Sequence, residues 1–161
     1  MTHSVGAGNY IRPYRRVRIR HFPEGASQSF TVGDPLILDT TSDKGHQVVL
    51  AGNDPTTGDV VGFAAEEATG VEGTLIAVWV LDGQGEFIAH VADTQALDND
   101  DIGAEYGIVA DGANGIYRLD RSETTSKVFR VLEIAPGHAH GDVNGAYIVK
   151  SAAGGQAVYR P

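Results

Sequence analysis

The sequence contains no cysteine. A disulfide framework, a thiolate metal site and a cysteine nucleophile are therefore excluded, so packing or oligomerisation must hold the fold together. Long apolar runs are also missing. No window reaches the ~18 apolar residues of a membrane-spanning helix, and the first residues lack the apolar stretch of a signal peptide. We expect a soluble protein that is made in the cytoplasm and has no membrane partner.

Side chains that favour helices are scarce as well. Leucine and methionine together number 9, whereas valine and isoleucine number 27. Stiff β-branched side chains in such excess favour strands over helices. Glycine provides 21 of the 161 residues, and turn signals such as residues 52–55 and 82–85 recur roughly every ten residues. Composition and rhythm together predict an all-β single domain, either an antiparallel β-sandwich or a partly open barrel.

The most apolar stretch of the chain, residues 74–81, carries apolar side chains on both of its faces. A strand of this kind is covered by protein on both sides, so we expect it to be the central strand and to bury Trp79. The turn signal at residues 82–85 joins it to a second strand at residues 86–92. This arrangement predicts a hairpin in which the two strands pair antiparallel.

Only two segments favour a helix, and both are short. Residues 64–69 form the first, and residues 94–101 form the second, in which acidic side chains lie near the N-terminus of a single turn. Residues 151–155 have the small-residue composition of a flexible spacer. We expect a last short strand after this spacer, at residues 156–160.

The net charge of −9 is distributed unevenly. Residues 1–21 contain five arginines and no acid, while residues 22–161 carry 7 basic and 21 acidic residues, a balance of −14. We therefore expect a basic N-terminal arm at 1–21, a β-rich body at 22–151 and a C-terminal tail at 152–161. An acidic body is a poor general binder of nucleic acid, because non-specific affinity depends on neutralising phosphates.

The arm has the alternation of a strand. Arg16, Arg18 and Arg20 alternate with Val17 and Ile19, which gives a period of two and one basic face. Three interpretations are open: an edge strand of the body protected by charge, an arm that lies on a neighbouring acidic surface, and a nucleic-acid contact. The residues expected to bind a partner are Tyr10, Ile11, Arg12, Tyr14, Arg15, Arg16, Val17, Arg18, Ile19 and Arg20.

Two patterns have the composition of a metal site. His138 and His140 precede Asp142 in a glycine-flanked segment, and residues 98–101 contain three aspartates, which partly match a calcium loop. The first pattern lacks a third ligand in a rigid element, and the second has Val109 where a calcium loop needs its twelfth-position glutamate. We therefore predict a solvated loop and an acidic turn, with no metal and no cofactor.

Catalytic signatures are missing too. The serines lie in turn-like contexts without a strand-to-helix nucleophile elbow, and the glycine pairs lack the lysine of a phosphate-binding loop. We assign no catalytic residue and expect a protein that is not an enzyme.

The order and length of the β-rich segments are similar to those of a known family. The matching segments begin with SFTVGDPLIL at 29–38 and VVGFAA at 60–65, and continue at residues 74–81, 86–91, 101–103, 106–107, 115–117 and 128–132. In this order, over about residues 30–150, the chain resembles the small capsid decoration (cement) proteins of tailed bacteriophages.

The resemblance implies a tulip-like β domain that forms a homotrimer on the outer surface of the capsid. It also implies an extended terminal arm that reaches a neighbouring subunit or the shell. The expected partners are the major capsid protein and further copies of this chain, and the expected location is the virion, assembled in the host cytoplasm. The family has no fixed arginine motif, so the docking residues named above come from the charge pattern alone.

Two other classes of function remain open. A carbohydrate-binding β-sandwich module needs exposed aromatic side chains on one face, and most of the 12 aromatic residues (5 Phe, 1 Trp and 6 Tyr) lie in core-like runs. A small hydrolase needs a concave pocket that contains acids or histidines with perturbed pKa values. A structure distinguishes these classes from a docking protein.

Overall fold

The computed structural model describes residues 10–39, 46–52, 54–111 and 115–152. Within these residues there are eleven strands and one short 3-10 helix, η1. The elements in chain order are β1 (Arg12–Arg15), β2 (Ile19–Pro23), β3 (Pro35–Leu38), β4 (Val48–Leu50), β5 (Val60–Ala64), β6 (Leu75–Val80), β7 (Glu86–His90), η1 (Asn99–Asp101), β8 (Glu105–Asp111), β9 (Ile116–Asp120), β10 (Phe129–Ile134) and β11 (Ala146–Ser151).

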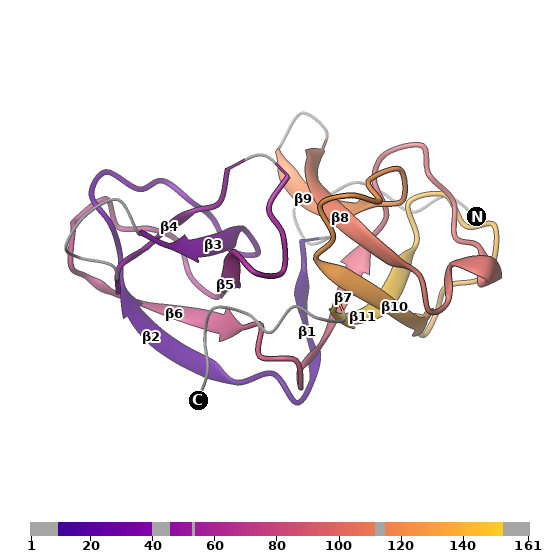
Figure 1. Ribbon diagram of the computed structural model, residues 1–161, viewed down its shortest axis with the longest axis horizontal. Coiled ribbons are helices and arrows are strands. Elements are labelled where there is room, and N and C mark those ends of the chain that lie inside the picture. The colour runs from indigo at the N-terminus through magenta and orange to yellow at the C-terminus, as the bar shows by residue number, and fades with distance from the viewer. Residues whose placement is uncertain (1–9, 40–45, 53, 112–114, 153–161) are drawn as a thin grey trace.

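The strands form two antiparallel sheets. One sheet has six strands in the order β1-β7-β11-β10-β8-β9, and the other has five in the order β2-β6-β5-β3-β4. Figure 1 shows the five-stranded sheet in the left half of the molecule and most of the six-stranded sheet in the right half, with β1 between them. The predicted all-β, antiparallel architecture is therefore confirmed. No helix in the described part of the chain is long and apolar enough to cross a membrane.

Each sheet folds back on itself through a single parallel bridge. In the five-stranded sheet, Val48 of β4 bridges to Glu24, directly after β2. In the six-stranded sheet, Leu119 of β9 bridges to Val91, directly after β7. Each bridge brings the last strand of a sheet, β4 or β9, back to a segment near the other edge of the same sheet. Both sheets are therefore curled.

The main core joins the two sheets. Phe63 comes from β5, and its ring centroid lies 5.4 Å from those of both Phe87 of β7 and Phe129 of β10. Val60 and Leu81 belong to the same buried cluster. A second cluster fills the curl of the five-stranded sheet and consists of Phe30, Leu36, Val48, Val61, Ala64, Ile76 and Val78. The larger core therefore holds the halves of the molecule together.

The predicted hairpin of residues 74–81 and 86–92 is wrong. β6 pairs with β2 and β5, whereas β7 pairs with β1 and β11 in the other sheet. The connecting turn is compact, because Asp82 Oδ1 accepts hydrogen bonds from the backbone N–H groups of Gln84 (3.0 Å) and Gly85 (3.3 Å). This turn leads the chain across to the second sheet, since β2 already occupies the free side of β6.

β6 is also less covered than its sequence predicts. Ile76, Val78 and Val80 are buried, but on the opposite face Leu75 is 61% exposed and Trp79 is half-buried. The prediction of a central strand with a buried Trp79 is therefore wrong, since β6 is second in its sheet. Tyr10 stacks on the Trp79 ring at a centroid distance of 6.4 Å and provides partial cover.

The N-terminal arm is not separate from the body. β1 joins the six-stranded sheet and β2 joins the five-stranded sheet, so the division expected at residue 21 falls inside β2. The interpretation as edge strands of the body matches this arrangement. The antiparallel pairing of both strands explains why, since arginine side chains on an edge do not prevent backbone hydrogen bonds.

The two expected helices have different outcomes. Residues 64–69 form no helix, because the Ala64 and Ala65 N–H groups bond to the carbonyl oxygens of Asp34 and Ala77. The single acidic turn is confirmed as η1, where the Asp98 side chain caps the helix by accepting from Asp100 N at 2.9 Å. The strand expected at residues 156–160 lies outside the described residues.

Candidate functional site

Within the part of the chain that the structure describes, the N-terminal edge segment, residues 10–23, supplies one edge strand to each sheet. Four strands end the two sheets: β1 and β9 in one, β2 and β4 in the other. β4 and β9 are each bridged to a further segment, at Glu24 and Val91. Because Glu24 continues β2, its bridge to Val48 and the hydrogen bond from the Gly25 N–H to Val48 O also close the C-terminal end of β2. Among the described residues, β1 and the N-terminal part of β2 have a strand on one side only. An edge of this kind is a ready template for pairing with another chain.

β1 is a protected edge. Its pairing with β7 shifts register between Pro13 and Arg15, which marks an irregularity in the strand. Pro13 has no N–H group to offer a neighbour, and Arg15 places a charge at the end of the strand. Proline, charge and a bulge are the devices that prevent edge-to-edge pairing. β1 is therefore poorly suited to accept a further strand.

β2 is a more accessible edge. The Val80 N–H bonds to Arg18 O at 3.0 Å, and the Glu24 N–H bonds to Thr74 O at 2.8 Å. The backbone groups of Arg18 and Glu24 therefore face β6. Because alternate residues of an antiparallel strand face its partner, the backbone groups of Ile19 and His21 point away from β6. Figure 1 shows β2 along the lower rim of its sheet. A peptide strand placed there meets unpaired N–H and C=O groups.

The surface beside this edge combines apolar and basic side chains. Ile19 is 54% exposed and lies opposite Trp79 in the ladder, and Leu75 lies opposite Pro23. Arg20 is exposed on the same strand. A neighbour that binds here contacts exposed apolar side chains next to an exposed guanidinium group.

Some of the basic charge is balanced within the molecule. Arg15 Nε lies 2.8 Å from Glu86 Oε1, and Arg15 Nη2 lies 3.6 Å from Glu133 Oε1. Arg18 donates to Asp82 Oδ2 at 2.9 and 2.7 Å. Burial opposes ionisation of Asp82, but hydrogen bonds from Gln84, Arg18 and Gly85 hold its pKa below the usual value. The basic face is thus less free than the charge pattern alone indicates.

The expected partner-binding residues fall into two groups. Ile11 is fully buried in the main core. Val17 packs against the same core, and its side chain closely approaches the backbone of Gly85. By contrast, Tyr14, Arg15, Arg16, Arg18, Ile19 and Arg20 are exposed, while Tyr10 and Arg12 are half-buried. The alternating pattern therefore identifies a surface strip, but two of its apolar members belong to the protein's own interior.

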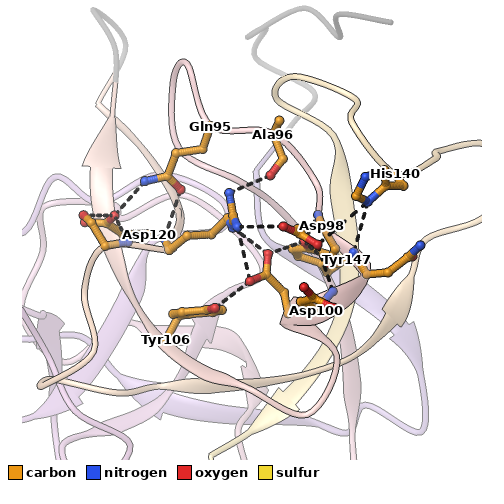
Figure 2. A network of polar contacts seen from close by, with 12 residues as sticks. Gln95, Ala96, Asp98, Asp100, Tyr106, Asp120, His140 and Tyr147 are labelled. Carbon is orange, nitrogen blue, oxygen red and sulfur yellow. Dashed lines mark hydrogen bonds and ion pairs between the residues drawn. The ribbon is translucent and has the colours of Figure 1, made fainter.

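A polar network that sequence reasoning missed lies in the other half of the molecule. Figure 2 shows Asp98, Tyr106 and Tyr147 gathered around η1. Asp101 is buried, and its carboxylate accepts from the hydroxyl groups of Tyr106 (2.6 Å) and Tyr147 (2.5 Å). Arg121 Nε lies 2.5 Å from the same carboxylate. The network connects η1 with β8, β11 and the turn after β9.

The electrostatics of this network are those of a satisfied structural cluster. Burial opposes ionisation of Asp101, but hydrogen bonds from Tyr106, Tyr147 and Arg121 lower its pKa below the usual value. Burial, with the Asp101 carboxylate, raises the pKa of Tyr106 to about 12. The Asp101 carboxylate is matched by two hydroxyl groups and a guanidinium, which is the arrangement expected of a structural clamp.

The histidine loop at residues 138–142 and the acidic turn at residues 98–101 lie close together in the structure. His140 Nδ1 lies 3.8 Å from Asp98 Oδ1 and accepts a hydrogen bond from the Asn99 N–H at 3.2 Å (Figure 2). This approach joins the histidine loop to the acidic turn, a contact across about forty residues of chain that no local motif predicts. Within the described ranges, no three His, Asp or Glu side chains converge as metal ligands.

A cavity of about 190 Å³ lies beside the β8–β9 hairpin. Its lining residues are Asp54, Ile108, Val109, Ala110 and Tyr117. Burial raises the pKa of Tyr117, and the charge of Asp34 adds to this effect. Among the described residues, the lining contains one carboxylate and no histidine, so these residues do not form the paired acid and base of a hydrolytic site.

No protein-family model matches this sequence, and a search of curated proteins gives no match.

Proposed function

We propose that this protein is a capsid decoration protein of a tailed bacteriophage. It binds the major capsid protein on the outer surface of the shell through the N-terminal edge segment, assembles as a homotrimer and stabilises the shell in the virion. The observation that carries the proposal is that residues 10–23 provide β1 and the open N-terminal part of β2 as strand edges among the described residues. The order of β-rich segments, which resembles that of decoration proteins, supports the same function.

The chemistry of β2 favours an extended, acidic segment as the docking partner. The outward backbone groups of Ile19 and His21 offer hydrogen bonds to any strand. Exposed Arg16, which lies between β1 and β2, favours carboxylates because a guanidinium holds them with two parallel hydrogen bonds. The acidic remainder of the molecule, at −14 over residues 22–161, repels the same partner elsewhere.

The test uses undecorated capsids of the phage or prophage that encodes the chain. Replacing Arg16, Arg18 and Arg20 together by serine is expected to weaken attachment at least tenfold, because partly desolvated charge pairs stabilise docking by a few kcal/mol. Binding by the unsubstituted protein is also expected to weaken but persist in 1 M salt, where the Debye length is ~3 Å. Sedimentation with capsids measures occupancy, and light scattering of the free protein is expected to give three times 17.0 kDa.

The matched control replaces Lys127 and Lys150, cations of the six-stranded half, by serine. It is expected to bind as the unsubstituted protein does. Equal occupancy by the arginine variant and this control would contradict docking through the edge segment. Deletion of residues 1–21 is unsuitable as a test, since it removes β1 and most of β2 from their sheets.

A further inference from the structure

His90 lies at the end of β7 in a buried polar site. It is only 4% exposed, and its Nδ1 lies 2.9 Å from the carbonyl oxygen of Asn144. A carbonyl can only accept a hydrogen bond, so Nδ1 carries the proton and Nε2 is the unprotonated nitrogen of a neutral ring. Nε2 has no hydrogen-bond partner among the described residues.

The groups that face His90 are mostly cationic or able to become so. Arg118 of β9 is fully buried, and its nearest acid in the described chain, Asp111, is 3.8 Å away. Arg12 of β1 contributes a further positive charge to the surroundings of the ring. The ring of His138, from the turn after β10, meets that of His90 edge-on at a centroid distance of 5.6 Å.

Acidic groups nearby offset only part of this charge. Asp93 is exposed, and its Oδ1 accepts from Asn144 Nδ2 at 3.4 Å. Asp93 and Asp111 both stabilise the charged form of Arg118, so these two carboxylates already act as the counter-charges of that guanidinium. A second buried cation at His90 therefore has no carboxylate of its own within the described residues.

His90 and Arg118 flank the point where the six-stranded sheet closes. His90 directly precedes Val91, Arg118 directly precedes Leu119, and these two neighbours form the parallel bridge between β7 and β9. The closure is completed by hydrogen bonds from Val91 N to Gly145 O (2.9 Å) and from Ala92 N to Leu119 O (2.8 Å).

We propose that His90 is an acid-sensitive latch, in which protonation of Nε2 opens the Val91–Leu119 closure while the five-stranded sheet remains folded. A protonated Nε2 is a charged donor without an acceptor, buried beside Arg118. Moving the ring into water relieves both penalties, and because His90 adjoins Val91 in the chain, we infer that this movement displaces Val91. The five-stranded sheet has a separate buried cluster inside its curl, and we expect this part of the molecule to keep its structure when the closure opens locally. The latch does not rest on the docking function proposed above.

The direction of the pH dependence follows from linkage. Burial, together with the charges of Arg12, His138 and Arg118, lowers the pKa of His90 to about 4, against 6.5 for an exposed histidine. The open state thus binds more protons between these two values. The closure is fully stable above pH 6.5 and loses stability as the pH falls toward 4.

Amide hydrogen exchange measured by NMR tests the latch. Protection of the Val91 and Ala92 amides, corrected for the intrinsic pH dependence of exchange, is expected to fall roughly tenfold per pH unit between pH 6 and pH 4.5. The Ala64 amide, which bonds to Asp34 O and belongs to the separate cluster of the five-stranded sheet, serves as the internal control and is expected to change far less. Parallel loss of protection at Ala64 would overturn the proposal.

Two variants separate the latch from general acid sensitivity. His90→Asn keeps a donor for Asn144 O but has no titratable ring, and it is expected to lose the pH dependence at Val91 and Ala92. His140→Gln removes an exposed histidine and is expected to keep it. If His90→Asn does not fold, NMR titration of the unsubstituted His90 ring decides the question. A ring pKa near 6.5, or an unchanged pH dependence in His90→Asn, would refute the latch.

Discussion

At the scale of single residues, the most constrained side chain is Glu24. It is fully buried at the end of β2, and its carboxylate accepts hydrogen bonds from the Thr69 N–H (2.9 Å), the Thr69 hydroxyl and the Gly70 N–H (3.2 Å). The backbone of Glu24 also bonds to Thr74 and Gly73. One buried carboxylate therefore organises the whole connection between β5 and β6. Buried acids of this kind are tolerated because both carboxylate oxygens accept hydrogen bonds.

Replacing Glu24 by glutamine tests this role. The amide keeps the shape but turns an acceptor into a donor that faces backbone N–H groups, so we expect a loss of about 1–3 kcal/mol in unfolding free energy. Urea unfolding followed by Trp79 fluorescence measures it. Glu67→Gln, on the exposed part of the same connection, is the control and is expected to change stability little. Equal stability of the two variants would show that the buried carboxylate does not organise the connection.

At the scale of elements, η1 is too short to be stable by its own hydrogen bonds. It is held by tertiary contacts, in which Asp101 joins Tyr106 of β8 and Tyr147 of β11, and Tyr147 also accepts from the Asp98 N–H at 2.7 Å. Arg121 donates to Ala96 O at 2.8 Å and so ties the preceding loop to the same cluster. A three-residue element thus connects distant strands of the six-stranded sheet.

Asp101→Asn is expected to weaken this cluster in two measurable ways. Unfolding free energy should fall by about 3 kcal/mol, since Arg121 loses the charge of its buried partner. Phenolate absorbance should show the pKa of Tyr106 moving from about 12 toward its usual 10, because burial remains but the carboxylate that also raises it is gone. Stability of the unsubstituted protein should decline between pH 10 and 12, as the raised tyrosine pKa is passed.

The neighbouring Asp100→Asn is the matched control, since Asp100 is exposed in the same turn. It is expected to leave the tyrosine titration unchanged. A Tyr106 pKa near 12 in Asp101→Asn would show that burial alone sets the value.

At the scale of the whole molecule, the two sheets share one core although their strands do not mix. Phe63 of the five-stranded sheet packs between Phe87 and Phe129 of the six-stranded sheet, and Leu81 lies in the same cluster at the crossing between the sheets. The chain itself passes between the sheets after β1 and again after β6. Shared packing and repeated crossing predict that the two halves unfold together.

Phe63→Ala is expected to lower the unfolding free energy by about 3–5 kcal/mol, because it removes a large side chain from a core that cannot collapse around the void. Trp79 fluorescence, which reports on the five-stranded sheet, and far-ultraviolet circular dichroism are expected to give one coincident transition. Leu75→Ala, on the exposed face of β6, should change stability by less than about 0.5 kcal/mol. Separated transitions for the two probes would contradict a single cooperative unit.

Much of the architecture follows from local sequence. The excess of valine and isoleucine over leucine and methionine predicts strands, and the frequent turn signals limit their length, as observed. The acidic turn at η1 follows from Asp98 as a cap with acids behind it. These features depend on backbone preference within a few residues, so no knowledge of distant neighbours is needed.

The pairing of strands, by contrast, does not follow from local sequence. The turn at residues 82–85 has the composition of a hairpin loop, yet it leads from one sheet to the other, since β2 occupies the position beside β6 that β7 would need. Competition for the same positions also explains why the arginine-rich segment contributes β1 and β2 to the sheets of the body. Which strand lies beside which is decided by competition among all strands for hydrogen bonds and apolar cover, and a local pattern does not contain that competition.

By itself, the sequence determined the all-β class, the short strands, the acidic turn and the concentration of basic charge before residue 22. Only the tertiary structure decided that β1 and β2 are the open edges, that Asp101 is clamped by two tyrosines and an arginine, and that His90 lies beside Arg118. The physical reason is the distance along the chain over which each effect acts. Propensity, turn geometry and net charge act along the chain, whereas burial, pairing and the charges around a buried group are set by residues that meet only when the sheets have formed.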